Sequence, residues 1–282
     1  MKIMLLGSSG QLGWELRRSL APLGVITALG RAGSGSLQGD LAKLDELART
    51  VRSLKPGIIV NAAAYTAVDQ AEAHAQTAEI VNAAAPEVLA YEARAIGAWL
   101  VHYSTDYVFD GEKNEPYVEK DATCPINAYG ASKLAGEQAI VASGCRHLIL
   151  RTSWVYGPRG RNFYLTMLRL AKERPELRVV DDQVGAPTSS LEIARATATL
   201  LAKGSQGLYH MTAAGETTWC GFARAILERA GSATPVVAIR AAEYPTPAQR
   251  PRNSRLDCSR LRTVTGVAPA AWEQGLAEVM ER

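Results

Sequence analysis

The sequence is poor in the residues from which metal sites and disulfides are built. It has 282 residues but only four cysteines and four histidines. The cysteines form no CxxC pair and show no metal-ligand spacing, and the histidines are scattered along the chain. We therefore expect reduced thiols, a cytoplasmic location, and neither a histidine-based metal site nor a Ser-His-Asp triad.

Long apolar runs and a strong charge are also missing. No stretch approaches the length of a membrane span, and the apolar start MKIMLLG is followed at once by polar residues, as in a first strand. The formal net charge is only +3, with 47% hydrophobic and 21% charged residues. These values favour a globular protein without membrane or nucleic-acid partners, and they are compatible with a small anionic ligand.

The order of the expected elements predicts a doubly wound α/β fold with a parallel (Rossmann) sheet. Strand patterns in KIMLL, VITAL, GIIVNAAAY, AWLVHYSTDYVF and RHLILRTSWVYG alternate with helical patterns. The helices are expected from Gln11, over residues 41–54 and 73–96, and from Asn127. The Val, Ile and Leu runs suit strands that are buried on both faces. Right-handed crossovers then place the carboxyl ends of the strands on one ligand-binding edge.

The second part of the chain has a different texture. Helices are expected over residues 162–172, 190–203 and 217–230, between short strand-like pieces. We expect a dinucleotide-binding Rossmann domain over residues 1–155. A smaller, interleaved C-terminal α/β lobe is expected over residues 156–282, with some segments returning to the Rossmann sheet. The segment AAEYPTPAQRPRNS is expected to be an ordered loop.

A glycine-rich turn follows the first strand directly. Gly7, Gly10 and Gly13 lie in GSSGQLG, between a strand and a helix, together with Gln11 and Leu12. Glycines let the chain turn sharply and bring backbone amides close to a pyrophosphate, which the helix N-terminus then faces. The spacing is GxxGxxG and not GxGxxG, but its position between strand and helix predicts dinucleotide binding at these residues.

The segment after the second strand bears on the choice of cofactor. No Asp or Glu lies between Glu15 and Asp40, so the acid that would bind the ribose 2′-hydroxyl of NAD is missing. Arg31 stands in its place and suits a 2′-phosphate. We expect NADPH, with NADH as the alternative; a solvated loop cation is the other interpretation of Arg31. Further cofactor contacts are expected at Asp40, Leu41, Ala62, Ala63 and Tyr65, with helix–sheet packing as the alternative for the last three.

Tyr129 and Lys133 lie four positions apart in AYGASKLAGE, on one face of the expected helix. An ammonium beside a phenol lowers a pKa that starts near 10, and such a Tyr can exchange a proton with a substrate oxygen. Alone, the pair is far more typical of an ordinary amphipathic helix with a half-buried Tyr. Thr105 adds a hydroxyl where the fourth strand ends, and the order of glycine turn, hydroxyl and YxxxK is far more specific than any one part.

These motifs resemble the extended branch of the short-chain dehydrogenase/reductase superfamily, which acts on nucleotide sugars. More closely, MKIMLLGSSGQLG, NAAAYTAVDQAE, YSTDYVFDG, AYGASKLAGE, RTSWVYG and QVGAPT resemble the dTDP-4-dehydrorhamnose reductase family. The resemblance implies NADPH-dependent reduction of the C4 ketone of dTDP-4-dehydro-L-rhamnose to dTDP-L-rhamnose. It also implies that Tyr129 donates the proton, Lys133 holds the nicotinamide ribose, and Thr105 orients the carbonyl.

The same resemblance extends to weaker expectations. Substrate contacts are implied at Thr66, Val68, Thr105, Asp106, Tyr107, Tyr129 and Trp154, with packing as the alternative for Tyr107 and Trp154. Arg250 and Arg252 are candidates for pairing with the diphosphate. Some relatives dimerise through Mg²⁺ held by glutamates, so Glu15 and Glu192 are candidates for a structural Mg²⁺ at a dimer interface, and no catalytic metal is expected.

Three questions stay open at this point. The chain is expected to be a monomer or a homodimer. Another sugar-nucleotide reductase or epimerase is the first alternative to the function above. The second is a non-catalytic NADP-binding regulatory subunit, although Thr105, Tyr129 and Lys133 are all present and favour an enzyme.

Overall fold

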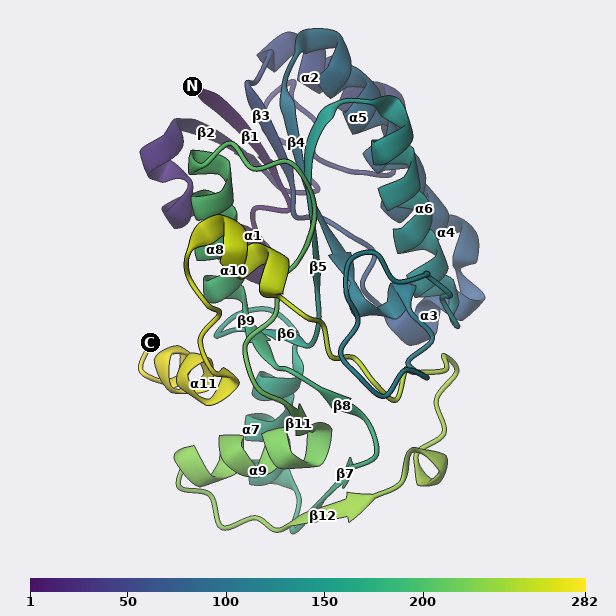
Figure 1. Ribbon diagram of the computed structural model, residues 1–282, viewed down its shortest axis with the longest axis vertical. Helices are drawn as coiled ribbons and strands as arrows, with labels where there is room; N and C mark the ends of the chain where they lie inside the picture. Colours follow the sequence, from purple (N-terminus) through teal and green to yellow (C-terminus); the bar gives the residue numbers. More distant parts are fainter.

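The computed structural model describes residues 1–282 and has a parallel sheet of six strands at its centre (Figure 1). The strand order is β10-β5-β4-β3-β1-β2, and every neighbouring pair is parallel. The strands are β1 (Lys2–Leu6), β2 (Val25–Leu29), β3 (Ile58–Asn61), β4 (Trp99–Thr105), β5 (Arg146–Thr152) and β10 (Gly207–His210). The predicted α/β fold with a doubly wound parallel sheet is confirmed.

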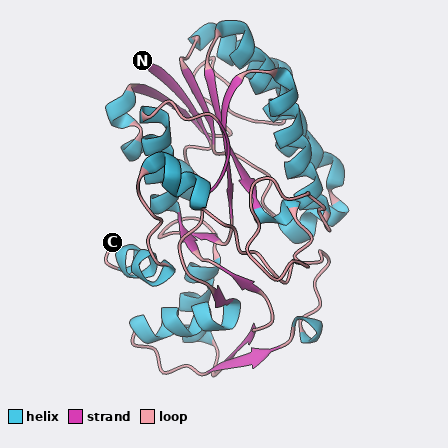
Figure 2. Cartoon of the chain, in the orientation of Figure 1, coloured by secondary structure: helices cyan, strands magenta, loops and turns pink.

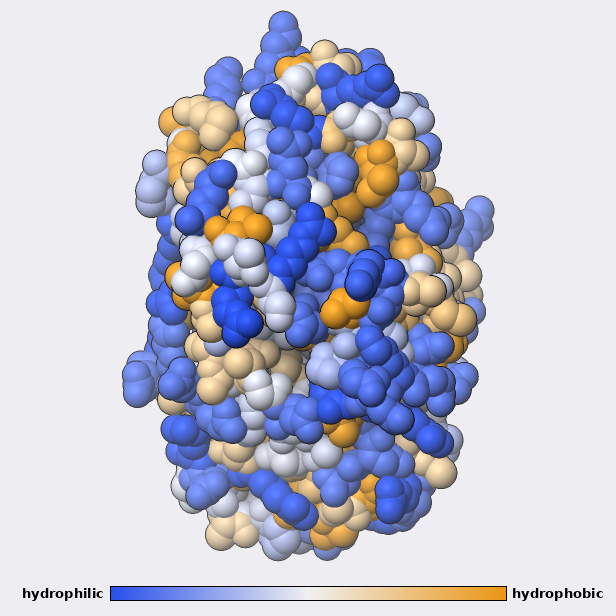
Figure 3. All heavy atoms as spheres, viewed as in Figure 1, coloured by the Kyte–Doolittle hydropathy of each residue, from blue (hydrophilic) through white to orange (hydrophobic).

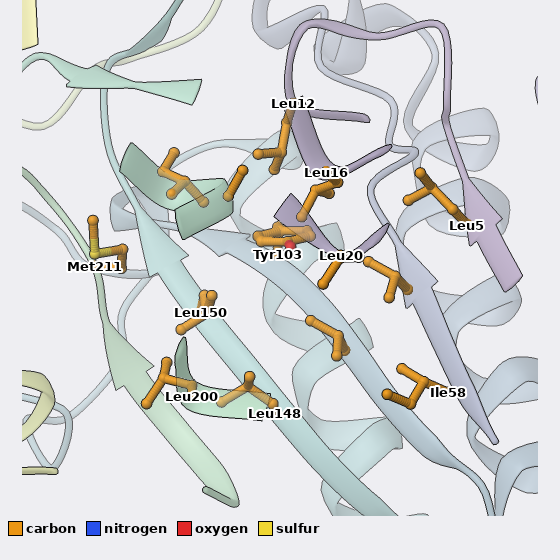
Figure 4. Close-up of a cluster of buried hydrophobic side chains, with 14 of the residues drawn as sticks. Leu5, Leu12, Leu16, Leu20, Ile58, Tyr103, Leu148, Leu150, Leu200 and Met211 are labelled. Carbon is orange, nitrogen blue, oxygen red and sulfur yellow. The ribbon is translucent and has the colours of Figure 1, made fainter. Parts of the chain in front are cut away.

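Helices cover both faces of this sheet (Figure 1). One face carries α2 (Leu44–Leu54), α5 (Ala85–Ile96) and α6 (Ala128–Ser143), and the other carries α1 (Gln11–Ser19), α8 (Ser190–Ala202) and α10 (Ser259–Thr265). Successive strand residues point to opposite faces, so Leu5 packs against the α1 and α8 side (Figure 4) while Met4 packs against α2 and α5. A strand buried on both faces therefore needs a continuous apolar run, which β1 has.

The second part of the chain builds a further apolar core, separate from the two that flank the main sheet. Its helices and short strands lie beyond one end of the main sheet in Figure 2. This core lies among α7 (Phe163–Glu173), α9 (Trp219–Arg229), α11 (Trp272–Met280) and β7 (Leu177–Val180). Three small two-stranded sheets pair β7 with β12 (Val236–Ile239), β6 (Val155–Tyr156) with β9 (Thr188–Ser189), and β8 (Val184–Gly185) with β11 (Thr217–Thr218). Between these pieces the chain returns to the main sheet as α8 and β10.

The Ala-rich region differs from the single helix expected over residues 73–96. It consists of α3 (Val68–Ala73), α4 (Ala75–Glu79), a π-helical turn (Ile80–Ala84) and α5. The helix expected over residues 41–54 begins only at Leu44. The reason is that the Asp40 carboxylate accepts from the Ala42 N–H at 3.1 Å and holds this stretch as a turn.

The outer surface carries few apolar groups. The face in Figure 3 is mainly hydrophilic, with apolar residues in small separate groups. None of the helices has the length and apolar character that a bilayer crossing requires.

The segment 241–254 contains one 3-10 turn, Ala241–Glu243, and otherwise follows an irregular path. All four cysteines have free thiols.

Candidate active site

The glycine turn after β1 is packed too tightly for any side chain. Gly7 has φ +75°, and a Cβ there would lie 2.6 Å from the Ala63 nitrogen at the end of β3. A Cβ on Gly13 would lie 2.1 Å from the Gly7 carbonyl oxygen. Gly10 caps α1 without a side-chain hydrogen bond, so the first N–H groups of the helix lack a side-chain partner. Such a cradle of backbone fits a dinucleotide pyrophosphate.

The other residues predicted at the cofactor edge differ in what their side chains do. The side chains of Leu12 and Leu41 are buried, one in each of the two cores of the sheet. Gln11 donates to the Val155 carbonyl at 3.3 Å and accepts from Asn162 at 3.1 Å, which links the turn to β6 and to the residue that caps α7. Arg31 is exposed in the loop after β2.

Thr105 ends β4 and shapes the next turn. Its hydroxyl accepts from the Tyr107 N–H at 3.1 Å and donates to Asp106 at 3.1 Å. Burial raises the pKa of the Asp106 carboxyl to about 7, against the effect of its hydrogen bonds. The second carboxylate oxygen of Asp106 is buried without a hydrogen-bond partner. A polar group in that condition suits a site that receives a polar ligand.

Tyr129 lies in the first turn of α6, close to this strand end. Asn127 caps the helix by accepting from the Gly130 N–H at 2.7 Å, and the Tyr129 ring meets Tyr107 edge-on at 5.8 Å between centroids. Burial and the Asp106 charge raise the pKa of Tyr129 to about 12, while the Thr105 hydroxyl lowers it. The expected lowering by Lys133 is therefore absent in this arrangement.

Lys133 points into the sheet. Its Nζ donates to the Tyr103 carbonyl at 2.5 Å and lies 3.0 Å from Nε2 of His102. Burial lowers the pKa of Lys133 to about 8. His102 is buried, and its ring is in direct contact with the Lys133 amine.

Asn82 holds the loop after β3 and was missed by the sequence analysis. Its amide accepts from the Tyr65 N–H at 2.8 Å and donates to the Tyr65 carbonyl and to Ser132 of α6. The π-helical turn presents this side chain, in an Ala-rich stretch where Asn82 is the only strongly polar residue between Glu79 and Glu87. That isolated amide was the available signal.

The Trp154 ring is held between two groups that lie far away in the sequence. It stacks on Trp219 with 3.6 Å between ring centroids, and its backbone has φ +48°. A Cβ on Gly185 would lie 2.6 Å from the Trp154 ring. Gly185 belongs to the QVGAPT motif, so its small size has a packing reason. Trp219 was not among the predicted site residues.

The predicted arginines behave differently from one another. Arg250 forms an ion pair with Asp69 of α3 at 2.8 Å, and the same carboxylate accepts from the Ala248 N–H. This pair ties segment 241–254 to the loop region after β3. Arg252 is exposed, as is Thr66, whereas Val68 is partly buried at the start of α3.

Comparison with known proteins identifies the family. The whole chain, residues 1–282, matches the family model described as the RmlD substrate binding domain. The chain belongs to this family. Its members include the dTDP-4-dehydrorhamnose reductase of Escherichia coli (strain K12), 46% identical over 99% of this chain and 97% of the relative. The enzyme of the same name from Burkholderia thailandensis is 48% identical over 96% and 95%.

Solved structures of the family agree. The crystal structure of dTDP-4-dehydrorhamnose reductase from Bacillus anthracis in complex with NADP has a TM-score of 0.94 and 36% identity, covering 99% of this chain and 98% of that one. The predicted membership in this reductase family is confirmed, and the chain is an oxidoreductase. The UDP-glucose 4-epimerase of Thermus thermophilus, at 21% identity and TM-score 0.85, shares the fold.

The magnesium prediction for this member of the family finds no support. No group of three or more His, Cys, Asp or Glu side chains is arranged to hold a metal ion. Glu15 is buried and pairs with Arg282 at 3.2 Å. One oxygen of Glu192 accepts from the Ala270 N–H at 2.8 Å, and burial raises the pKa of Glu192 to about 7. Glu15 is thus engaged within the chain, whereas the second carboxylate oxygen of Glu192 is buried without a hydrogen-bond partner.

Proposed function

We propose that this chain reduces the C4 ketone of dTDP-4-dehydro-L-rhamnose to dTDP-L-rhamnose with NADPH, and that Tyr129 supplies the proton. The observation that carries the proposal is the approach of Thr105 and Tyr129 at the carboxyl end of β4, on a chain that matches named reductases over almost its full length. The glycine cradle at Gly7 lies at the same edge of the sheet.

The backbone of the glycine turn would hold the pyrophosphate, and Ala62, Ala63 and Tyr65 would line the cofactor. When bound, NADPH supplies a hydride. The protein's part in the reduction is to orient the ketone and to deliver a proton to its oxygen as negative charge grows there. The Thr105 hydroxyl is suited to orienting the ketone, and Tyr129 to protonating it.

A donor must carry its proton when the substrate arrives. With a pKa of about 12, Tyr129 is protonated at neutral pH, so it fits the role of an acid. Donation leaves a phenolate, which a cation nearby would stabilise. Lys133 is the amine on the same face of α6, one turn further along, and we assign it this role.

Arg31 supports the preference for NADPH. It is exposed in the loop after β2, where the 2′-phosphate of the adenosine ribose would lie, and a guanidinium binds phosphate through charge-assisted hydrogen bonds. A relative with 36% identity was crystallised with NADP. NADH stays open as a second cofactor.

The test is to follow NADPH oxidation by absorbance with dTDP-4-dehydro-L-rhamnose, using UDP- and GDP-linked 4-keto sugars as matched substrates. Tyr129→Phe should lower kcat by at least about a hundredfold, the usual contribution of a general acid, while NADPH binding is kept. Tyr91→Phe, on the exposed side of α5, is the control. Near-normal turnover in Tyr129→Phe would rule out the proton donor, and equal rates with all three sugars would rule out the substrate.

The same assay separates the alternatives. An epimerase would interconvert sugars without net NADPH consumption, and the epimerase likeness at 21% identity concerns the fold alone. A non-catalytic subunit would bind NADPH without oxidising it. The presence of Thr105, Tyr129 and Lys133 favours an enzyme over a non-catalytic subunit, and net NADPH consumption separates a reductase from an epimerase.

A further inference from the structure

A buried row of contacting polar side chains runs from β3 through β4 to α6. Asn61 and His102 are paired residues on neighbouring strands, and Lys133 reaches His102 from the helix. Nδ2 of Asn61 is 3.3 Å from Nδ1 of His102, and Nζ of Lys133 is 3.0 Å from Nε2. The exposed fractions are 1%, 1% and 2%. With water excluded, every hydrogen of these side chains must meet an acceptor, and the Tyr103 carbonyl takes one hydrogen of Lys133 Nζ at 2.5 Å.

The backbone of Ala63 fixes which groups donate and which accept in this row of hydrogen bonds. Its N–H donates to Oδ1 of Asn61 at 3.3 Å, so the NH₂ group of the amide faces His102. Nδ1 of His102 must then accept, and the hydrogen of a neutral imidazole sits on Nε2. An Nε2–H donates, so Lys133 must offer a lone pair. An ammonium has no lone pair, and a free amine has one.

The surroundings of Lys133 make the free amine the main form only above about pH 8. Burial lowers the pKa of Lys133 to about 8, and Glu137 on the same helix acts in the opposite direction. The Glu137 carboxylate, however, is held by Arg151 of β5 through hydrogen bonds of 2.6–3.2 Å. Burial is the larger cause that lowers the pKa of His102 well below its usual range, and an ammonium at Lys133 lowers it further, so the imidazole is neutral with either form of Lys133.

We propose that His102, oriented by Asn61, is a positioning residue for both forms of Lys133: it donates to the free amine from Nε2–H, and it must change its own tautomer when Lys133 becomes an ammonium. To become an ammonium, Nζ takes the hydrogen from Nε2, and one proton from solvent replaces it on Nδ1. The Asn61 amide must then turn so that Oδ1 accepts from Nδ1–H. The Ala63 N–H then loses its acceptor, and the loss of this hydrogen bond opposes the conversion of Lys133 to an ammonium.

The proposal rests on the role of Lys133 beside Tyr129 proposed above. The ammonium is the form that stabilises the phenolate left by proton donation. His102 therefore decides at which pH this form is available. Without an ammonium the reaction slows, so turnover should fall as pH rises through the pKa of Lys133.

The decisive variant is Asn61→Asp, because a carboxylate has the same shape as the amide but can only accept hydrogen bonds. Its carboxylate fixes the hydrogen of His102 on Nδ1, leaves Nε2 as an acceptor and favours the ammonium. The alkaline fall of kcat, expected near pH 8 in the native chain, should move up by about one pH unit. Asn61→Leu is the matched control, because it removes the amide without adding a charge and should give no upward shift.

A second measurement does not depend on turnover. Imidazole ¹⁵N NMR of the full chain reports which ring nitrogen carries the hydrogen, and His102→Gln assigns the His102 signals by their loss. Above the Lys133 pKa of about 8, the native chain should show Nε2–H and Asn61→Asp should show Nδ1–H. An Nδ1–H form in the native chain overturns the proposal, as does an unmoved pH profile in Asn61→Asp. Full activity of Tyr129→Phe would instead count against the proposed function, and the NMR result would still stand.

Discussion

The buried ion pair between Glu137 and Arg151 fastens α6 to β5, and its removal gives a sharp prediction. The two side chains are only 6% and 4% exposed, and they share three hydrogen bonds. The guanidinium also lies over the Phe109 ring at 5.0 Å. Glu137→Leu leaves the Arg151 charge buried without a partner, which costs about 3–5 kcal/mol of unfolding free energy.

The double variant Glu137→Leu/Arg151→Met removes both charges and keeps similar volumes. We expect its free energy of unfolding to lie within about 2 kcal/mol of the native value, because a hydrophobic replacement offsets the lost pair. Urea unfolding followed by circular dichroism measures all three proteins, and an unchanged m-value shows that they unfold from a similar state. If Glu137→Leu costs less than about 1 kcal/mol, or if the double variant is less stable than the single variant, the reasoning is wrong.

Three further predictions concern single residues. Arg31→Ala should raise KM for NADPH about tenfold, the worth of a charge-assisted hydrogen bond, and leave KM for NADH nearly unchanged; equal effects would refute the assignment. Gly185→Ala should displace the Trp154 ring, since its Cβ would lie 2.6 Å from it. The variant should lose about 1–3 kcal/mol of unfolding free energy, measured by thermal unfolding, and its KM for the sugar nucleotide should rise. An unchanged KM would show that Trp154 does not contact the substrate. Asp106 has a raised folded-state pKa, so its contribution to stability is fully present below the unfolded pKa near 4 and is lost as pH rises towards 7. Against Asp106→Asn, the native free energy of unfolding should fall by up to about 4 kcal/mol over that window; parallel pH curves would contradict this.

Much of the fold could be predicted because its signals are local. Continuous apolar runs mark the strands of a sheet covered on both faces, as in β1 and β3. Asn127 indicates the start of α6, because its side chain caps the helix. The π-helical turn could not be predicted in the same way, because alanine-rich sequence is equally compatible with an uninterrupted helix.

The candidate site was predictable as a set of residue types more than as a set of contacts. YxxxK places Tyr129 and Lys133 on one helix face, and that periodicity is local. The contact between Lys133 and His102 depends on how β4 lies against α6, which no local pattern specifies. The stack of Trp154 on Trp219 joins two elements far apart in the chain. Leu12 and Leu41, which were predicted from their place beside a binding motif, have side chains in the cores of the sheet, and their contact with the cofactor stays a prediction.

The π-helical turn at Ile80–Ala84 makes the number of residues in this region matter more than their identity. Such a turn amounts to one extra residue in an α-helix, and each α-helical residue rotates the chain by about 100°. Deleting one alanine would restore regular α-helical hydrogen bonding but rotate Asn82 away from Tyr65 and Ser132. The segment should therefore accept many substitutions among small residues and reject almost every change in length.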